Sequence, residues 1–86
     1  MTEEFLDDDA GYIAYVRANP SCFVLNSHRI PSAAYLVIHR ARCRTFGGPP
    51  RTSEFLKVCS ESVEELEDWA GGKTGAYPDR CRTCQP

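Results

Sequence analysis

Apolar residues recur with helical spacing near the start of the chain. Tyr12, Tyr15 and Val16 follow the i, i+3, i+4 pattern of one buried stripe. Pro20 follows, and the residue before a proline is sterically disfavoured in the helical conformation. The pattern therefore predicts a helix over about residues 8–19.

A second helical stripe lies in the second half of the chain. Val63, Leu66 and Ala70 again repeat at spacings of three and four residues. Gly71-Gly72 comes directly after this stripe, and glycine is common just beyond the C-terminus of a helix. We therefore predict a helix over about residues 61–70.

Residues that cap helix N-termini precede both stripes. Asp7, Asp8 or Asp9 can accept a hydrogen bond from the first turn of the first helix, where negative charge is also favourable. Ser62 can do the same for the second helix, because it begins a sequence of the capping-box form, Ser-Val-Glu-Glu. Ser60 is the alternative cap.

Three shorter apolar runs between the helices have the composition of strands. Residues 22–26, 34–39 and 54–59 are rich in β-branched and aromatic residues and are bounded by turn-forming residues. The connection before the last run contains Gly47-Gly48-Pro49-Pro50, a loop by composition. We predict an α+β fold in the order α-β-β-β-α, with a small three-stranded antiparallel sheet, two helices and an irregular C-terminal tail.

Length and composition indicate one soluble domain. The 86 residues are few enough that a core of this size is marginal without a metal ion or disulfides. No apolar run approaches the ~18 residues of a membrane span. We treat residues 1–86 as one domain, with the acidic residues 1–7 mobile. The same acidic segment does not resemble a signal peptide, so we expect a cytoplasmic protein with reduced thiols.

Two pairs of residues have spacings that suit one four-ligand metal site. Cys81-x2-Cys84 is a knuckle spacing, in which two thiolates bind one ion from a tight turn. His39-x3-Cys43 can supply the other two ligands if the chain turns after the histidine, since four residues of straight strand span about 13 Å. Four protein ligands leave no open coordination position. We therefore predict one structural Zn²⁺ per chain, bound by His39, Cys43, Cys81 and Cys84, which tethers the C-terminal tail.

The chain has five cysteines, so two lie outside this set. Cys59 ends a predicted strand and is the alternative to His39, which would make a site of four cysteines. Cys22 begins another predicted strand, where a small buried side chain is expected.

Arginine is concentrated around the predicted metal site. Eight of the ten basic residues are arginine, whose planar guanidinium suits phosphate and carboxylate. One or two arginines can compensate the negative charge of a zinc–thiolate cluster. The stretch over residues 29–51 alone holds five arginines and no acid. The pattern indicates a surface that binds nucleic acid, formed by Arg29, Arg40, Arg42, Arg44, Arg51, Arg80 and Arg82.

Several short motifs follow one another along nearly the whole chain. They are Phe23-Val24-Leu25-Asn26, the stretch Tyr35 to Cys43 ending in His-Arg-Ala-Arg-Cys, Lys57-Val58-Cys59, Glu65-Leu66, Trp69 and Cys81-x2-Cys84. Together they resemble a little-characterised family of small bacterial domains, which occur alone or appended to larger proteins, some of nuclease or defence type. The resemblance implies zinc binding, and it implies no particular activity. Cys22 stands where the family has glycine, which argues against a ligand role for this residue.

The sequence favours a binding module over an enzyme. It contains no Ser/His/Asp pattern, phosphate-binding loop or HExxH motif, and we infer no small-molecule substrate. The leading hypothesis is a small zinc-stabilised module that presents its arginine-rich face to nucleic acid, alone or as an accessory to a DNA-processing or defence system. The alternative is an adaptor that binds an acidic protein partner through the same arginines. A small nuclease is the third hypothesis.

Overall fold

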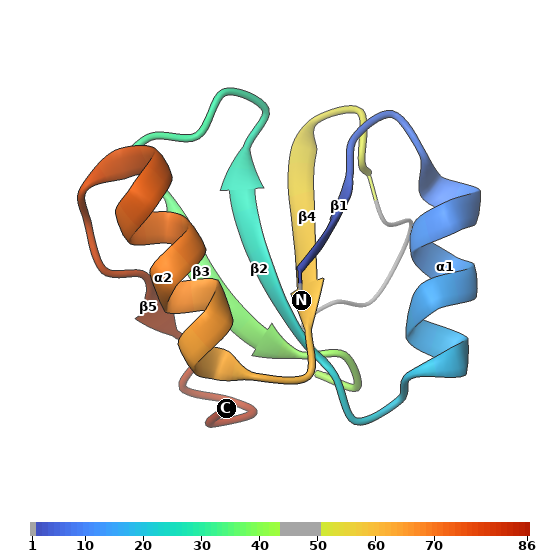
Figure 1. Ribbon diagram of the computed structural model, residues 1–86. Helices are drawn as coiled ribbons and strands as arrows, with labels where there is room; N and C mark the ends of the chain where they lie inside the picture. Colours follow the sequence, from blue (N-terminus) through green and yellow to red (C-terminus); the bar gives the residue numbers. More distant parts are fainter. Residues whose placement is uncertain (1, 44–50) are drawn as a thin grey trace.

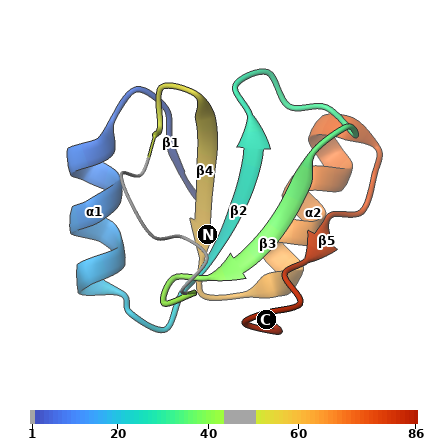
Figure 2. The ribbon, with the colours of Figure 1, turned by 180° about the vertical axis from the view of Figure 1, so that it is seen from behind.

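A twisted five-stranded sheet forms the centre of the molecule, with one helix on each face (Figure 1). The computed structural model describes residues 2–43 and 51–86. Its strands lie in the order β1-β4-β2-β3-β5; neighbours are antiparallel except β3 and β5, which run parallel (Figure 2). The elements are β1 (Glu3–Phe5), α1 (Asp9–Ala18), β2 (Phe23–His28), β3 (Leu36–Arg40), β4 (Phe55–Ser60), α2 (Val63–Thr74) and β5 (Asp79–Arg80).

The α+β class fits the sequence prediction, but the predicted three-stranded antiparallel sheet is wrong. Two further strands lie at the edges, where β1 pairs with β4 and β5 pairs with β3. β1 has three residues and β5 has two, which is too short for the alternation by which a strand is recognised in a sequence. β1 lies within residues 1–7, the segment expected to be mobile, and β5 lies in the tail expected to be irregular.

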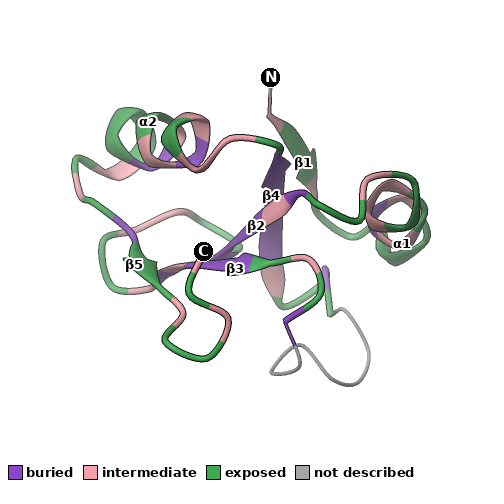
Figure 3. Cartoon of the chain, turned by 90° about the horizontal axis from the view of Figure 1, so that it is seen from below, coloured by how far each residue is buried: buried purple, intermediate pink, exposed green. Residues whose placement is uncertain are grey.

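The larger part of the core lies between α2 and the sheet. Leu25 of β2 lies opposite Ile38 of β3 on one side and Val58 of β4 on the other, so the three side chains form one row. Leu66 and Ala70 of α2 cover this row, and all five residues are fully buried. Figure 3 shows the buried strands in purple between the two largely exposed helices. Because burying an aliphatic side chain of this size contributes about 2 kcal/mol, the row holds α2 against the sheet.

The other face of the sheet packs against α1. Tyr12 forms a cluster with Val24 of β2 and Cys59 of β4, and the ring of Phe5 meets the Tyr12 ring edge-on at 6.0 Å between centroids. Successive residues of β2 therefore serve opposite faces, as the period of a strand requires: Val24 packs toward α1 and Leu25 toward α2. Neither α1 nor any other helix in the described ranges is long and apolar enough to cross a membrane.

Both helices begin at residues that the sequence marks as caps. The Asp8 carboxylate, one of three candidates, accepts a hydrogen bond from the Gly11 amide at 2.9 Å. Ser62 caps α2 and accepts from the Glu65 amide at 3.4 Å. Ser60, the alternative cap, instead donates to the Glu65 carboxylate at 2.6 Å and accepts from the Ser62 amide.

The end of α2 differs from the prediction. Gly71-Gly72 lies inside the helix, which continues to Thr74. Gly75 is the C-cap, with a φ of 75°, and its amide donates to the Gly71 carbonyl at 2.9 Å. The left-handed conformation is the one that glycine adopts without steric cost. The extra turn carries the chain to the point from which β5 can return along β3.

Candidate metal centre

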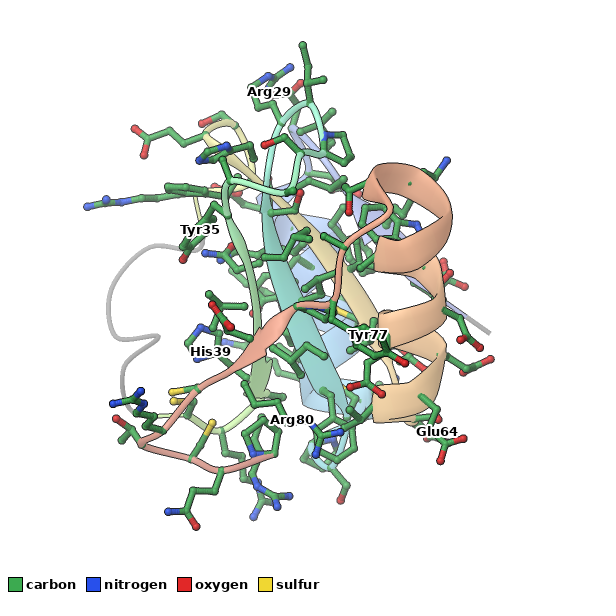
Figure 4. All side chains as sticks on the ribbon, turned by 90° about the vertical axis from the view of Figure 1, so that its left-hand side faces the viewer. Arg29, Tyr35, His39, Glu64, Tyr77 and Arg80 are labelled. Carbon is green, nitrogen blue, oxygen red and sulfur yellow. The ribbon has the colours of Figure 1, made fainter. Side chains whose placement is uncertain are left out.

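Four side chains from two distant parts of the sequence meet at one end of the sheet. His39 comes from β3, Cys43 from the turn after it, and Cys81 and Cys84 from the segment after β5. One ligand atom from each lies within 4.8 Å of the others, which is the arrangement of a site that could hold a metal ion. Figure 4 shows sulfur atoms, in yellow, close to the labelled His39. The four residues are the ones that the spacing of the sequence selects.

The chain turns after His39 as the ligand spacing requires. β3 ends at Arg40, and the Cys43 amide donates to the Arg40 carbonyl at 2.9 Å, which closes a tight turn. This turn brings the Cys43 side chain back toward His39. Cys43 is buried and His39 is 9% exposed, so one half of the site is built into the edge of the core.

The parallel pairing of β5 with β3 brings the second half of the site to the same place. In this register Ile38 lies opposite Arg80, and the Cys81 amide donates to the Ile38 carbonyl at 2.8 Å. One residue further, Cys81 comes alongside His39. Because the two strands run in the same direction, the segments that follow them leave the sheet at the same end, and their ligands meet there.

Arg40 fixes the position of the knuckle that carries Cys84. Its backbone amide donates to Cys84 Sγ at 3.2 Å, and its Nε donates to the Cys84 carbonyl at 2.9 Å. Its Nη2 donates to the Gln85 carbonyl at 3.1 Å, while the Gln85 amide closes the turn on the Cys81 carbonyl at 3.0 Å. An amide that donates to sulfur favours the thiolate form, which is the form that binds metal.

The distances and the acid–base properties of the donors fit a tetrahedral metal. Cys43 Sγ and Cys81 Sγ are 3.7 Å apart, and two sulfurs bound tetrahedrally at about 2.3 Å from one zinc ion are separated by about 3.8 Å. Burial, followed by the nearby charge of Lys57, lowers the pKa of His39. The imidazole is therefore neutral at neutral pH and able to bind a metal. Burial raises the pKa of Cys84 to about 11, and the neighbouring thiols of Cys43 and Cys81 add to the effect.

Cys59, the alternative to His39, lies elsewhere. His39 and Cys59 both lie opposite Val24, one on each side of β2. Two strand spacings separate them, about 10 Å, which is too far for two ligands of one ion. Cys59 is fully buried and clusters with Cys22, which is 1% exposed. Both cysteines are therefore small side chains buried in apolar surroundings, as the sequence suggests for Cys22.

The arginines at the metal end of the sheet differ in their surroundings. Arg40 is bound to the C-terminal carbonyls, with its guanidinium carbon 5.5 Å from the centroid of the Phe23 ring. Arg80 forms an ion pair with Glu67 of α2 at 3.2 Å. Arg42 and Arg82 are exposed. Among these four arginines of the described residues, the acidic helix α2 thus neutralises Arg80.

Two of the other predicted arginines, Arg29 and Arg51, do not join this group. Arg29 follows β2 at the opposite end of the sheet from His39 (Figure 4) and forms an ion pair with Asp7 at 2.8 Å. Arg51 lies 3.9 Å from Glu54. Arg44 falls outside the described residues. The predicted arginine-rich face is therefore divided between two ends of the molecule.

A buried lysine was not anticipated from the sequence. Lys57 is 5% exposed, and its Nζ donates to Asn26 Oδ1 at 2.7 Å. Asn26 in turn donates to the Tyr35 hydroxyl at 3.0 Å, and the Tyr12 ring lies 5.9 Å from Nζ. Burial lowers the pKa of Lys57 to about 8. The available signal was a lysine inside an otherwise apolar strand, Phe55-Leu56-Lys57-Val58.

Comparisons with known proteins add no relative. No protein-family model, curated protein or solved structure matches the chain at a significant level.

Proposed function

We propose that the chain is a small zinc-stabilised module that binds nucleic acid through the surface around its metal centre. The observation that carries the proposal is the convergence of one imidazole and three thiols at the end of the sheet where exposed arginines lie. The metal has a structural role in this proposal, because four protein ligands leave no position for a substrate or a water molecule.

The donor set supports zinc. Three cysteines and one histidine form a common structural zinc set, and thiolates disfavour magnesium and calcium. The separation of 3.7 Å between the two sulfurs is close to a tetrahedral edge. A zinc ion with three thiolates and a neutral imidazole carries a net charge of about −1. The amide and guanidinium of Arg40 lie beside this charge and stabilise it.

The charge distribution supports an anionic partner. Arg40 and Arg80 are held by groups of the protein itself, while Arg42 and Arg82 extend from the turn and the knuckle into solvent. Exposed guanidiniums are suited to phosphate, because the planar fork is pre-organised and loses little conformational freedom for each hydrogen bond that it forms. The overall charge of −2 is then compatible with nucleic acid, since the acids lie mainly on α2 and near the N-terminus.

The test is a fluorescence-polarisation titration of the zinc-loaded protein with labelled duplex and single-stranded oligonucleotides over a series of salt concentrations. We expect binding that is weakly dependent on sequence and that falls linearly in a plot of log K against log salt concentration. No binding of the loaded protein to DNA or RNA at low salt would refute the nucleic-acid proposal and favour an acidic protein partner. Zinc content, measured on the same sample, tests the metal assignment separately.

A further inference from the structure

A groove lies beside the metal centre, between two turns of the chain. It has a volume of about 260 Å³ and is lined by Pro20, Ser21, Cys22, Arg40 and Arg42. These five residues include two arginines and no acid. Except for the arginines, none of them belongs to the face predicted from the sequence.

Two turns form the walls of this groove and are tied together. One is the turn before β2, which contains Ser21, and the other is the turn that leads from β3 to the metal ligand Cys43. The Ala41 amide of the second turn donates to the Cys22 carbonyl of the first at 3.0 Å. Metal binding by Cys43, at the end of the second turn, would hold this turn from the other side. The groove therefore has a fixed geometry before any ligand binds, which lowers the entropic cost of binding.

The polar groups of the groove are matched to an anion with several acceptor oxygens. The Arg40 guanidinium is immobilised by its bonds to the carbonyls of Cys84 and Gln85. Arg42 and Ser21, one from each turn, also line the groove and are exposed. The exposed guanidinium of Arg42 and the hydroxyl of Ser21 are donors that proteins use for phosphate, and the fixed charge of Arg40 adds to the positive potential of the groove.

We infer that the groove between Ser21 and Arg42 binds one backbone phosphate of nucleic acid. The inference rests on the proposed function and specifies where on the metal-side surface the polynucleotide makes contact. The groove is open to solvent, which suits a phosphodiester within a longer strand. A strand that enters here passes next to the knuckle, where Arg82 can meet a neighbouring phosphate.

The experiment compares zinc-loaded variants in the polarisation assay. Arg42→Ala should weaken binding to unrelated sequences and reduce the magnitude of the salt slope by about one unit, because one fewer counterion is released. Arg42→Lys should keep the slope, since it keeps the charge, but bind more weakly because the planar fork is lost. Ser21→Ala should weaken binding by a factor of about 2–12 without changing the slope, as expected for one hydrogen bond.

Lys73→Ala is the matched control. Lys73 is exposed in the last turn of α2, so this variant loses one positive charge away from the groove and should bind as the wild type does. Zinc content and the fluorescence of Trp69, the single tryptophan, establish that each variant is folded. In amide NMR spectra, addition of the oligonucleotide should shift Ser21, Cys22 and Arg42.

The outcomes separate the two proposals. If the wild type binds no nucleic acid, the proposed function fails and the subsite fails with it. If the wild type binds but Arg42→Ala has the affinity and slope of Lys73→Ala, the subsite is overturned and the proposed function stands. NMR shifts confined to the opposite end of the sheet, around Arg29, would overturn the subsite and also the placement of the binding surface around the metal centre.

Discussion

The buried lysine should make the stability of the protein depend on pH, and replacing it should remove that dependence. Lys57 is 5% exposed, and burial lowers its pKa from 10.5 to about 8. Between these values the unfolded chain binds more protons than the folded one, so the contribution of Lys57 to the free energy of unfolding rises with pH. The penalty is complete below about pH 8 and disappears above about pH 10.5. The whole shift corresponds to about 3 kcal/mol at ~1.4 kcal/mol per unit.

Lys57→Met removes the charge and keeps most of the side-chain volume. At pH 7.5 the variant gains the ~3 kcal/mol of avoided penalty, but Asn26 Oδ1 loses its donor at a cost of about 1–3 kcal/mol. The stability at pH 7.5 should therefore be unchanged or modestly higher. The informative quantity is the change with pH. The unfolding free energy of the variant relative to that of the wild type should fall by about 2 kcal/mol from pH 7.5 to pH 9.5.

Urea denaturation followed by Trp69 fluorescence measures this difference. Trp69 packs against the core cluster under α2, so its emission reports loss of the core. A hydrogen bond with Cys22 and burial raise the pKa of the Cys59 thiol, and burial raises the pKa of the Tyr12 hydroxyl, so both groups stay neutral where Lys57 titrates. Lys73→Met, at an exposed position, is the control. A difference between variant and wild type that stays constant over this pH range would refute the burial argument.

Three further predictions concern the metal. The reduced protein should contain about one equivalent of zinc, and a strong chelator should sharply lower its melting temperature; absence of metal together with a Cys81–Cys84 disulfide would contradict the site. His39→Ala and Cys81→Ser should abolish zinc binding, while Cys59→Ser should retain it and cost about 1–3 kcal/mol of stability; the reverse result would assign the fourth ligand to Cys59. Addition of zinc to the metal-free protein at pH 7.5 should release protons, since the Cys84 thiol has a pKa of about 11 and must ionise to bind; calorimetry in buffers of different ionisation enthalpy measures the number released, and a value of zero would exclude thiolate ligation.

The local parts of the fold could be predicted because their signals are local. The caps at Asp8 and Ser62, the stop at Pro20 and the apolar stripe of α2 each depend on a few neighbouring residues. The metal ligands also form two local pairs. Their combination could be predicted from chemistry alone, because a pair of ligands does not complete a tetrahedral site.

The parts that could not be predicted depend on contacts between distant residues. Two residues of β5 carry no periodic signal, and the parallel pairing with β3 depends on the length of α2 and on the return from Gly75. The ion pair of Arg29 joins residues 22 positions apart in the sequence. From the sequence alone Arg29 was therefore assigned to the arginine-rich face, although in the fold it lies at the opposite end of the sheet. The environment of Lys57 likewise depends on α1, which covers that face of the sheet only in the folded chain.

The position of β5 links the metal to the proposed function. Only two residues of this edge strand pair with β3. The position of the tail also depends on the hydrogen bond from the Cys81 amide to Ile38, on the contacts of Arg40 with the tail, and on the metal ligands. Removal of the metal should therefore displace the proposed binding surface, because the turn that carries Arg42 and the knuckle that carries Arg82 are no longer held together by a shared ion. Raised salt weakens the same surface by screening alone and leaves the shared ion in place. Chelation should consequently abolish nucleic-acid binding and lower stability together, whereas salt should abolish binding while the zinc stays bound. A protein that bound nucleic acid equally well after chelation would place its binding surface away from the metal centre.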